Sequence, residues 1–542
     1  MRSLTVVGGG IAGLGTAALA AARGWKVTLL ESRSEVGGRA GLHTEAGFAF
    51  DTGPSWYLMP EVFDRFFSLL GQDNPLNLHD LDPGFRVWPE GLLETEQLQD
   101  SGSGTSAVDV PRGTEPFLRL VSQREPGAAQ RVRRYVESAS DTYRLALEHF
   151  LYTNFTTRDY TRFARPDVLA RLPRLPRLFG QSMQRRIEQT VTDPVLQKIL
   201  GYPAVFLGTQ PKTAPSMYHL MTNLDVVDGV RYPMGGMHTI ITAMAQAAVR
   251  LGVDIRTDCT VTAVRTQGRR VVGVTARCGS ADVPGAADQG GSADVPGAAG
   301  QGAHVPSADE VEAGSRGSGS VVDFDSDAVV AACDLEAFEA LLPQRLRTRS
   351  QQWWARRDYG IGAVTLLLGV DRKLPQLHHH NLFFTSDWDS NFTQIFGSDK
   401  RLPQPASAYV CVPSRTDASV APADSENLFV LVPAPADPQL RTGSQLLEQY
   451  ADRIVDSLGA SIGVDLAAHL RVRRAFGPGD IDPRRGSALG PANVLSQSAM
   501  FRFPQKARAR GLVHAGAYTA PGVGLPMCLI SAENAVDLLE RT

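Results

Sequence analysis

The chain has 542 residues, of which 43% are hydrophobic and 20% are charged, and its formal net charge is −3. This length allows two to four domains, and the hydrophobic content is ordinary for a protein with a buried core. With a pI near 6.4, the weak negative charge argues against a nucleic-acid-binding protein that works by bulk positive charge.

The first element is a strand–turn–helix–strand unit that ends at Glu31. Thr5-Val6-Val7 predicts a β-strand, and residues 8–13 fit the pattern G-x-G-x-x-G. An Ala-rich helix over 14–22 and a second strand over 27–30 complete the unit. This arrangement is typical of dinucleotide binding; the alternative is a plain strand–helix–strand unit.

Each residue of the pattern has a physical role. Gly8 allows a tight turn, Gly10 lets the backbone approach a pyrophosphate, and Gly13 lets the helix pack against the strand. The amide groups at the helix N-terminus attract a diphosphate. Glu31 is placed to accept hydrogen bonds from a ribose hydroxyl. These four residues are therefore predicted to bind a cofactor.

Two glycines and an arginine follow at Gly37-Gly38-Arg39. Paired glycines permit close backbone approach, and a guanidinium pairs bidentately with phosphate. The alternative is a Gly-Gly turn beside a solvated arginine. The stretch resembles the paired-glycine motif of the flavin-binding amine-oxidase and carotenoid-desaturase superfamily. That resemblance implies that Gly38 and Arg39 lie beside the diphosphate of FAD.

A strand over 48–51 is expected to run into the Gly53-Pro54 turn. In the desaturases a similar stretch passes near the flavin, which implies a cofactor contact for Gly53; the alternative is a simple hairpin end. Helical periodicity then dominates 128–152.

An arginine-rich stretch lies between residues 158 and 186, with leucines interspersed. Such a stretch fits an anionic membrane surface, and equally a solvated surface or arginines paired within the fold. Its arginines are Arg158, Arg162, Arg165, Arg171, Arg174, Arg177, Arg185 and Arg186.

A helix over 238–250 and strands over 253–256 and 261–264 follow the stretch Tyr232-Pro-Met-Gly-Gly-Met237. A similar stretch leads back into the FAD domain of the desaturases. Next, residues 279–290 are repeated at 291–302 with a single difference. Two short Gly/Ala/Pro copies cannot build a repeat fold, so 279–320 is expected to be a disordered, dispensable expansion of a surface hairpin.

The five cysteines are scattered, odd in number and without a C-x-x-C pair. This usage indicates reduced thiols rather than a disulfide framework or a zinc site. The run His378-His379-His380 raises the question of a metal, but no nearby cysteine or further spaced histidine completes a ligand set. No metal is therefore expected.

The C-terminus predicts a strand that enters a turn at Gly516, followed by a helix over 527–539. In the superfamily this unit closes over the isoalloxazine, which implies a cofactor contact for Gly516. With the Pro-Gly-x-Gly-x-Pro element at 521–526, the chain resembles the bacterial-type phytoene desaturases. It departs from them at Ala520, where many have His, and at Cys528, where many have Gly.

The resemblance implies an α/β fold. It comprises a Rossmann-like FAD-binding domain of the GR2 type formed by discontinuous segments, a mixed α+β substrate domain and a helical membrane-facing region. The expected segments are 1–85 (FAD-binding), 86–225 (substrate and helical), 226–340 (return to the FAD domain), 341–490 (substrate) and 491–542 (FAD-binding).

The implied activity is desaturation of an apolar carotenoid precursor such as phytoene by hydride transfer to FAD, for which the protein supplies position and a dry site. No catalytic residue can be assigned. Alternatives on the same fold are a carotenoid ketolase, a flavin amine oxidase and a non-catalytic prenyl-lipid escort protein. The uncharged segment 6–22 carries the glycine pattern and is expected to be a strand and a buried helix. Because no other segment approaches an uncharged span of 20 residues, a cytoplasmic protein peripherally attached to a membrane is expected. Oligomeric state is left open.

Overall fold

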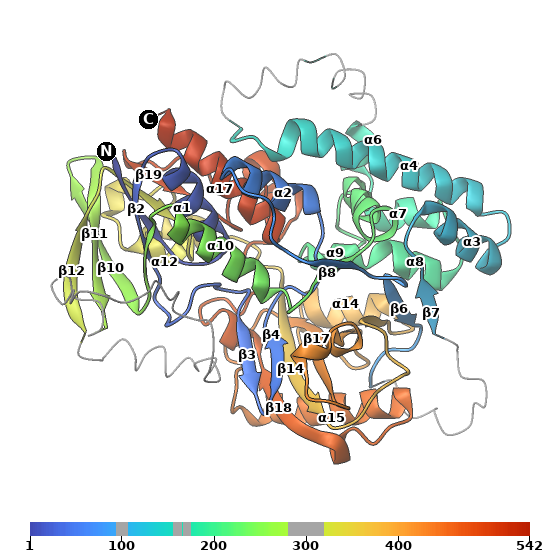
Figure 1. The fold of residues 1–542 in the computed structure, drawn as a ribbon. Helices are drawn as coiled ribbons and strands as arrows, with labels where there is room; N and C mark the ends of the chain where they lie inside the picture. The colour runs from blue at the N-terminus through green and yellow to red at the C-terminus, as the bar shows by residue number, and fades with distance from the viewer. Residues whose placement is uncertain (94–106, 156–164, 166–167, 169–174, 280–318, 542) are drawn as a thin grey trace.

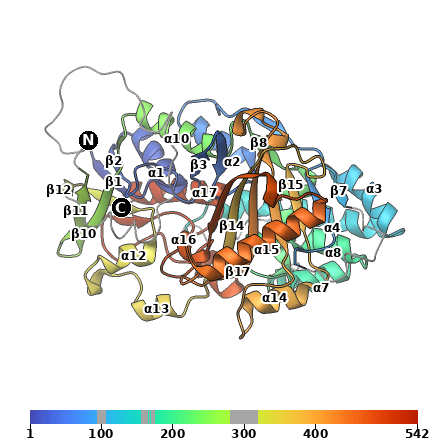
Figure 2. The ribbon, with the colours of Figure 1, turned by 90° about the horizontal axis from the view of Figure 1, so that it is seen from below.

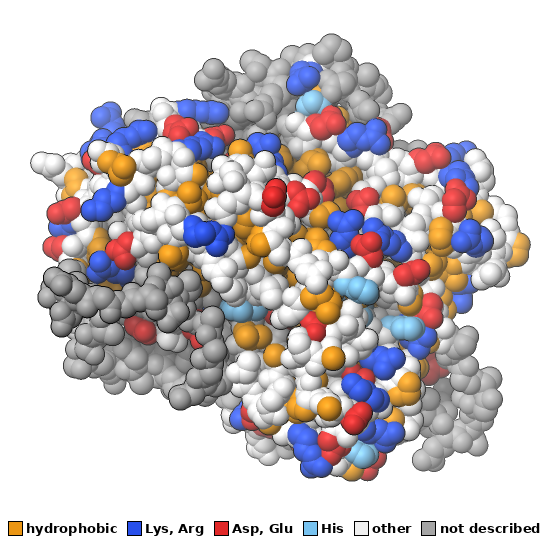
Figure 3. Space-filling model, in the orientation of Figure 1, with side chains coloured by type: hydrophobic (Ala, Val, Ile, Leu, Met, Phe, Trp, Pro, Cys, Tyr) orange, Lys and Arg blue, Asp and Glu red, His pale blue; other side chains and the backbone are white. Residues whose placement is uncertain are grey.

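The computed structural model describes the chain except for residues 94–106, 156–164, 166–167, 169–174, 280–318 and 542. Figure 1 shows three regions: a parallel sheet with its helices near both chain termini, a large antiparallel-rich sheet below it, and a helical region beside both. Acidic and basic side chains are interspersed over the face seen in Figure 3.

The parallel sheet joins strands from distant parts of the chain in the order β19-β13-β1-β2-β9. Both faces of this sheet are covered, and its three central strands are mostly apolar, as expected for a buried parallel sheet. The strands are β1 (Ser3–Val7), β2 (Lys26–Leu30), β9 (Asp254–Arg256), β13 (Ala328–Ala331) and β19 (Leu512–His514).

Three helices share a hydrophobic core with one face of this sheet: α1 (Ile11–Ala22), α10 (His238–Arg250) and α17 (Leu525–Glu540). Helix α1 is almost wholly buried and contacts both α10 and α17. The predicted strands and helices of this region are confirmed. The first helix begins earlier than expected because Gly10 already serves as its N-cap.

A three-stranded antiparallel sheet lies next to it, built from β10 (Cys259–Gln267), β11 (Arg270–Cys278) and β12 (Ser320–Asp325). Cys278 pairs with Ser320 across β11 and β12, so the ends of the predicted insertion meet across one ladder. Ser320 already belongs to β12, which corrects the expected boundary. Residues 280–318 lie outside the described residues, so the disorder predicted for the insertion stays a prediction.

The second large sheet has the order β18-β14-β17-β16-β15-β6-β7. Helix α15 (Gln445–Ile462) lies across one face, as Figure 2 shows, and shares a hydrophobic core with the sheet. The strands are β6 (Phe85–Trp88), β7 (Val108–Val110), β14 (Ile361–Val370), β15 (His380–Phe383), β16 (Ala408–Cys411), β17 (Glu426–Pro435) and β18 (Leu470–Phe476).

The helical region confirms the periodicity predicted over 128–152: α4 (Ala129–Ala146) continues into a π-helical turn, Leu147–Leu151. No helix among the described residues is long and apolar enough to cross a membrane. The other helices of the helical region are α3 (Thr114–Arg124), α6 (Leu175–Gly180), α7 (Met183–Glu188), α8 (Pro194–Gly201) and α9 (Pro203–Phe206).

Shorter elements connect the regions. They are β3 (Leu42–Glu45), β4 (Phe48–Asp51), α2 (Pro60–Leu69), β5 (Leu78–Asp80), β8 (Arg231–Pro233), α12 (Leu335–Ala340), α13 (Gln351–Ala355), α14 (Trp388–Phe396) and α16 (Pro478–Ile481).

Candidate functional site

A cavity of about 1570 Å³ lies between the carboxyl ends of the parallel strands and one face of the seven-stranded sheet. Ligands of parallel α/β sheets bind at this edge, where the connecting loops converge. Seven of the eight residues predicted to bind a cofactor line the cavity: Gly8, Gly10, Glu31, Gly38, Arg39, Gly53 and Gly516.

The eighth, Gly13, lies behind the glycine-rich turn. A Cβ at Gly13 would stand 1.8 Å from the carbonyl oxygen of Gly8, so only glycine allows α1 to pack this closely. Gly8 has φ +103°, a conformation that favours glycine. At Gly10, in contrast, a Cβ would meet nothing nearer than 3.9 Å, which leaves room in front of the N-terminus of α1.

Glu31 is buried at the end of β2 and fixes the turn. Its carboxylate accepts hydrogen bonds from the backbone N–H of Gly9 at 2.6 Å and of Arg33 at 2.9 Å. The guanidinium of Arg39 lines the cavity, and no hydrogen bond or ion pair holds it among the described residues. An anion in the cavity could therefore accept hydrogen bonds from both the N-terminus of α1 and this guanidinium.

Two further glycines hold the loops around the cavity. A Cβ at Gly53 would lie 1.9 Å from the carbonyl oxygen of Arg39, so the two loops touch through their backbones. Gly516, with φ +104°, donates its N–H to Ser531 Oγ at 2.9 Å, which ties the turn after β19 to α17. The loops that carry the glycine-rich turn, Arg39 and Gly516 are thus held together around one cavity.

The rest of the cavity is largely apolar, and an aromatic cluster around Trp56 forms part of its wall. The Trp56 ring lies 5.4 Å from that of Phe206, 6.0 Å from that of Tyr202 and 4.8 Å from that of His380. Sequence reasoning missed this cluster because its members come from segments far apart in the chain.

Hydrogen bonds connect lining residues of this wall to polar groups behind it. Tyr202 Oη donates to Asp225 Oδ2 at 2.6 Å, and burial raises the pKa of Asp225 to about 7. Ser55 Oγ lies 2.7 Å from Tyr409 Oη, which lies 2.8 Å from His380 Nδ1. Burial holds the pKa of His380 well below its usual value, so this imidazole is neutral.

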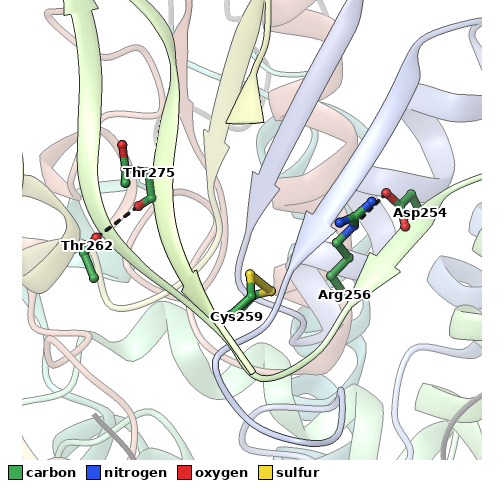
Figure 4. The surroundings of a disulfide bond; sticks show 6 residues. Asp254, Arg256, Cys259, Thr262 and Thr275 are labelled. Atoms are coloured by element: carbon green, nitrogen blue, oxygen red, sulfur yellow. Dashed lines mark hydrogen bonds and ion pairs between the residues drawn. A yellow bond between two sulfur atoms is a disulfide. The ribbon is translucent and has the colours of Figure 1, made fainter. Parts of the chain in front are cut away.

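The expectation that all cysteines are reduced is wrong for one pair. Cys259 and Cys278 form a disulfide, shown in Figure 4 at the end of the β10–β11 ladder. They stand directly opposite each other in the antiparallel register, which spacing along the chain does not reveal. Cys333, Cys411 and Cys528 are free thiols, and burial raises the pKa of Cys411 to about 12.

The histidine run, for which no metal is expected from the sequence, has a cysteine beside it in space. Cys411 lies beside His379 and His380, and one donor atom from each of the three falls within 4.8 Å of the others. A cysteine therefore does approach the histidine run in space, although none is near it in the sequence.

Comparison with known proteins decides the family. A model described as flavin containing amine oxidoreductase matches residues 11–289. The carotenoid 3,4-desaturase of Haloarcula japonica is 33% identical over 99% of this chain and 98% of that protein. The chain belongs to the carotenoid desaturase family. A zeta-carotene-forming phytoene desaturase of Myxococcus xanthus is 30% identical over 99% of this chain and 94% of that protein.

Solved structures share the fold. An oxidoreductase from Methanosarcina mazei superposes with a TM-score of 0.58 at 14% identity, covering 99% of this chain and 100% of that one. Putrescine oxidase gives 0.56 at 14% identity, over 100% and 99%. The chain thus has the fold of the flavin-dependent amine oxidases, and its family makes it a flavin-dependent oxidoreductase, which excludes the escort-protein interpretation.

Proposed function

We propose that this chain is an FAD-dependent carotene desaturase that inserts double bonds into a long apolar polyene precursor such as phytoene. The observation that carries the proposal is the cavity itself. It begins at the glycine-rich turn, passes the aromatic cluster and reaches exposed apolar side chains, Phe179, Met500 and Phe501. A long hydrocarbon needs such a path, and the full-length relatives named as desaturases support this substrate class.

The residues of the turn would hold the ADP half of FAD in the Rossmann manner. The diphosphate would lie against the N-terminus of α1 and the Arg39 guanidinium, and Glu31 would accept hydrogen bonds from the ribose. Bound flavin supplies an acceptor for hydride from a substrate C–H bond.

The remaining lining residues would position the substrate and exclude water. The Trp56 cluster offers flat apolar surfaces to a polyene. The carboxyl group of Asp225 lies behind Tyr202 rather than in the lining, so the cavity wall presents the phenol and not the acid. This arrangement keeps buried charge away from a hydrocarbon.

Expression in cells that make phytoene but lack a desaturase tests the function. The expected product is a coloured carotenoid with a longer conjugated system, seen by absorption after extraction. Unchanged phytoene beside flavin-loaded protein would contradict the proposal. An oxygenated carotenoid would indicate a ketolase, and oxidation of added amines would indicate an amine oxidase.

Glu31→Ala should weaken FAD binding by roughly 1–3 kcal/mol, the cost of losing a charge-assisted hydrogen bond. Titration of apoprotein with FAD measures the change. Glu35→Ala is the matched control, because Glu35 lies in the same loop and outside the cavity lining. Equal FAD affinity in the Glu31 variant and the parent would rule out the ribose contact.

We further propose that the protein, in a cytoplasmic location, docks peripherally on a membrane, which dissolves its substrate. About half of the arginine-rich stretch 158–186 lies outside the described residues, so its predicted docking role stays a prediction. The described Arg186 donates to Ser138 Oγ and lies over the Tyr135 ring, which fits the alternative of arginines held within the fold. The apolar rim supports docking independently, since Met500 is 52% and Phe501 57% exposed at the cavity. Because Cys259 and Cys278 form a disulfide, the cysteines do not support the cytoplasmic location.

The double variant Met500→Ser/Phe501→Ser should lower flotation with anionic vesicles at least severalfold, because burying each apolar side chain contributes about 1.5–3 kcal/mol. Leu446→Ser is the control: Leu446 is 60% exposed on α15 and does not line the cavity. If both variants float equally, this rim does not insert. If the parent fails to float, the membrane proposal is wrong.

A further inference from the structure

Two strands of the large sheet bring three potential metal ligands together. His379 precedes β15, His380 begins it, and Cys411 ends β16. Because β15 and β16 are antiparallel, His380 stands directly opposite Cys411 in the ladder. The ring centroids of the two histidines are 4.5 Å apart, and one donor atom from each of the three residues lies within 4.8 Å of the others.

The three side chains are sealed from solvent. His379 is 5% exposed, and His380 and Cys411 are each 1% exposed. The Nδ1 atoms of the histidines lie 2.8 Å from hydroxyls, those of Thr416 and Tyr409 respectively. Neither Nε2 atom has a hydrogen-bond partner among the described residues. A buried polar atom without a partner is costly and requires an explanation.

We propose that His379, His380 and Cys411 bind one zinc(II) or copper(I) ion. Thiolate and imidazole donors select these ions, whereas magnesium, calcium and manganese prefer carboxylates, which the group lacks. The hydroxyl beside each Nδ1 can accept its proton, and the Nε2 atom then keeps a lone pair for a metal. Binding forms a metal–sulfur bond in place of the Cys411 S–H bond and releases that proton to solvent.

The donor atoms lie close to the spacing of a loaded site. Metal–sulfur and metal–nitrogen bonds of about 2.3 and 2.0 Å place tetrahedral donors roughly 3.5 Å apart. Small side-chain rotations would close the difference from the present limit of 4.8 Å.

The ion would have a structural role at the cavity wall. The Trp56 ring stacks on His380 at an interplanar angle of 17°, and Ser55 bonds Tyr409, the hydroxyl partner of His380. A metal would therefore fix the segment after Gly53 against β15 and β16. Flavin binding does not enter this argument, so the metal and the proposed desaturase activity can fail separately.

The histidine run supplies a matched control. His378 directly precedes the pair, but its Nε2 faces Asp109 at 3.4 Å and it is not part of the group. Full-length, flavin-loaded protein would be incubated with Zn²⁺ or with Cu⁺ under reducing conditions, freed of excess ion and analysed for metal. We expect one ion per chain in the parent and in His378→Gln, and a loss of at least tenfold in His380→Gln and Cys411→Ser.

X-ray absorption of the loaded parent gives a readout that does not depend on the variants. One sulfur at about 2.3 Å and nitrogens at about 2.0 Å are expected around the metal. The proposal is overturned if the parent retains no ion, if its ion has no sulfur neighbour, or if His378→Gln loses as much metal as His380→Gln. Preference for Zn²⁺ or Cu⁺ then identifies the ion.

Discussion

Gly13→Ala is expected to destabilise the protein by about 3 kcal/mol or more, because the added methyl group has no space. Its Cβ would lie 1.8 Å from the Gly8 carbonyl oxygen, which is backbone and cannot rotate away. Either α1 or the glycine-rich turn must move. Thermal and denaturant unfolding measure the loss, which should appear with flavin present or absent.

Gly10→Ala should give the opposite pattern. Its Cβ would come no closer than 3.9 Å to its nearest neighbour, the carbonyl oxygen of Gly37, so the apoprotein should unfold like the parent. The methyl group would nevertheless occupy the approach to the N-terminus of α1. We expect flavin affinity to fall at least tenfold, which corresponds to about 1.4 kcal/mol.

Gly180→Ala, at the end of α6 with nothing within 4 Å, controls for the loss of a glycine as such. The flavin-to-protein absorbance ratio after purification reports cofactor content, and apoprotein unfolding reports stability. Full flavin content in Gly10→Ala would place the diphosphate elsewhere. A parent-like stability of Gly13→Ala would contradict the close packing of α1 on the turn.

The sequence predicted the strand–turn–helix–strand unit at one end of the cavity correctly because its signals are local. The strand, turn and helix around Gly8–Gly13, and the acid at Glu31, follow one another within a single unit. Helix α10 agrees with its predicted bounds for the same reason. The periodicity of hydrophobic side chains and the spacing of glycines are read from a few consecutive residues. They therefore predict the unit whatever the rest of the fold is.

The other features depend on which strands pair. Cys259 meets Cys278 through the β10–β11 register, and His380 meets Cys411 through β15 and β16. Trp56 reaches His380 across two regions of the molecule. Such contacts are fixed by sheet order and register, which periodicity does not specify. The spacing of the cysteines therefore suggested free thiols although one pair is bonded.

Asp225→Asn should stabilise the protein increasingly as the pH rises. Asp225 lies in the π-helical turn Asn223–Val227 and is 5% exposed. Tyr202 Oη donates to its Oδ2, while its Oδ1 has no hydrogen-bond partner among the described residues. Burial raises the pKa of this carboxyl to about 7, so the folded protein holds the proton more tightly than the unfolded chain.

The sign of the pH dependence follows from that proton. Below about pH 4 both states are protonated, and between about pH 4 and 7 the unfolded chain ionises while the folded protein resists. The contribution of Asp225 to the free energy of unfolding therefore falls through this range. Burial raises the pKa of Asp51 to about 6, which acts in the same direction.

An asparagine at position 225 keeps the side-chain shape and an oxygen for Tyr202 but removes the ionisation. Its stability relative to the parent should grow by roughly 2–3 kcal/mol between about pH 5 and pH 8, whatever constant cost its amide adds. Denaturant unfolding of flavin-loaded protein at both pH values measures this difference. Asp399→Asn, an exposed carboxyl paired with Arg401, should show a flat difference. Parallel pH profiles of unfolding free energy for the parent and Asp225→Asn would contradict the raised pKa of Asp225. Tyr202 would then donate its hydrogen bond to an ionised carboxylate that the folded protein stabilises.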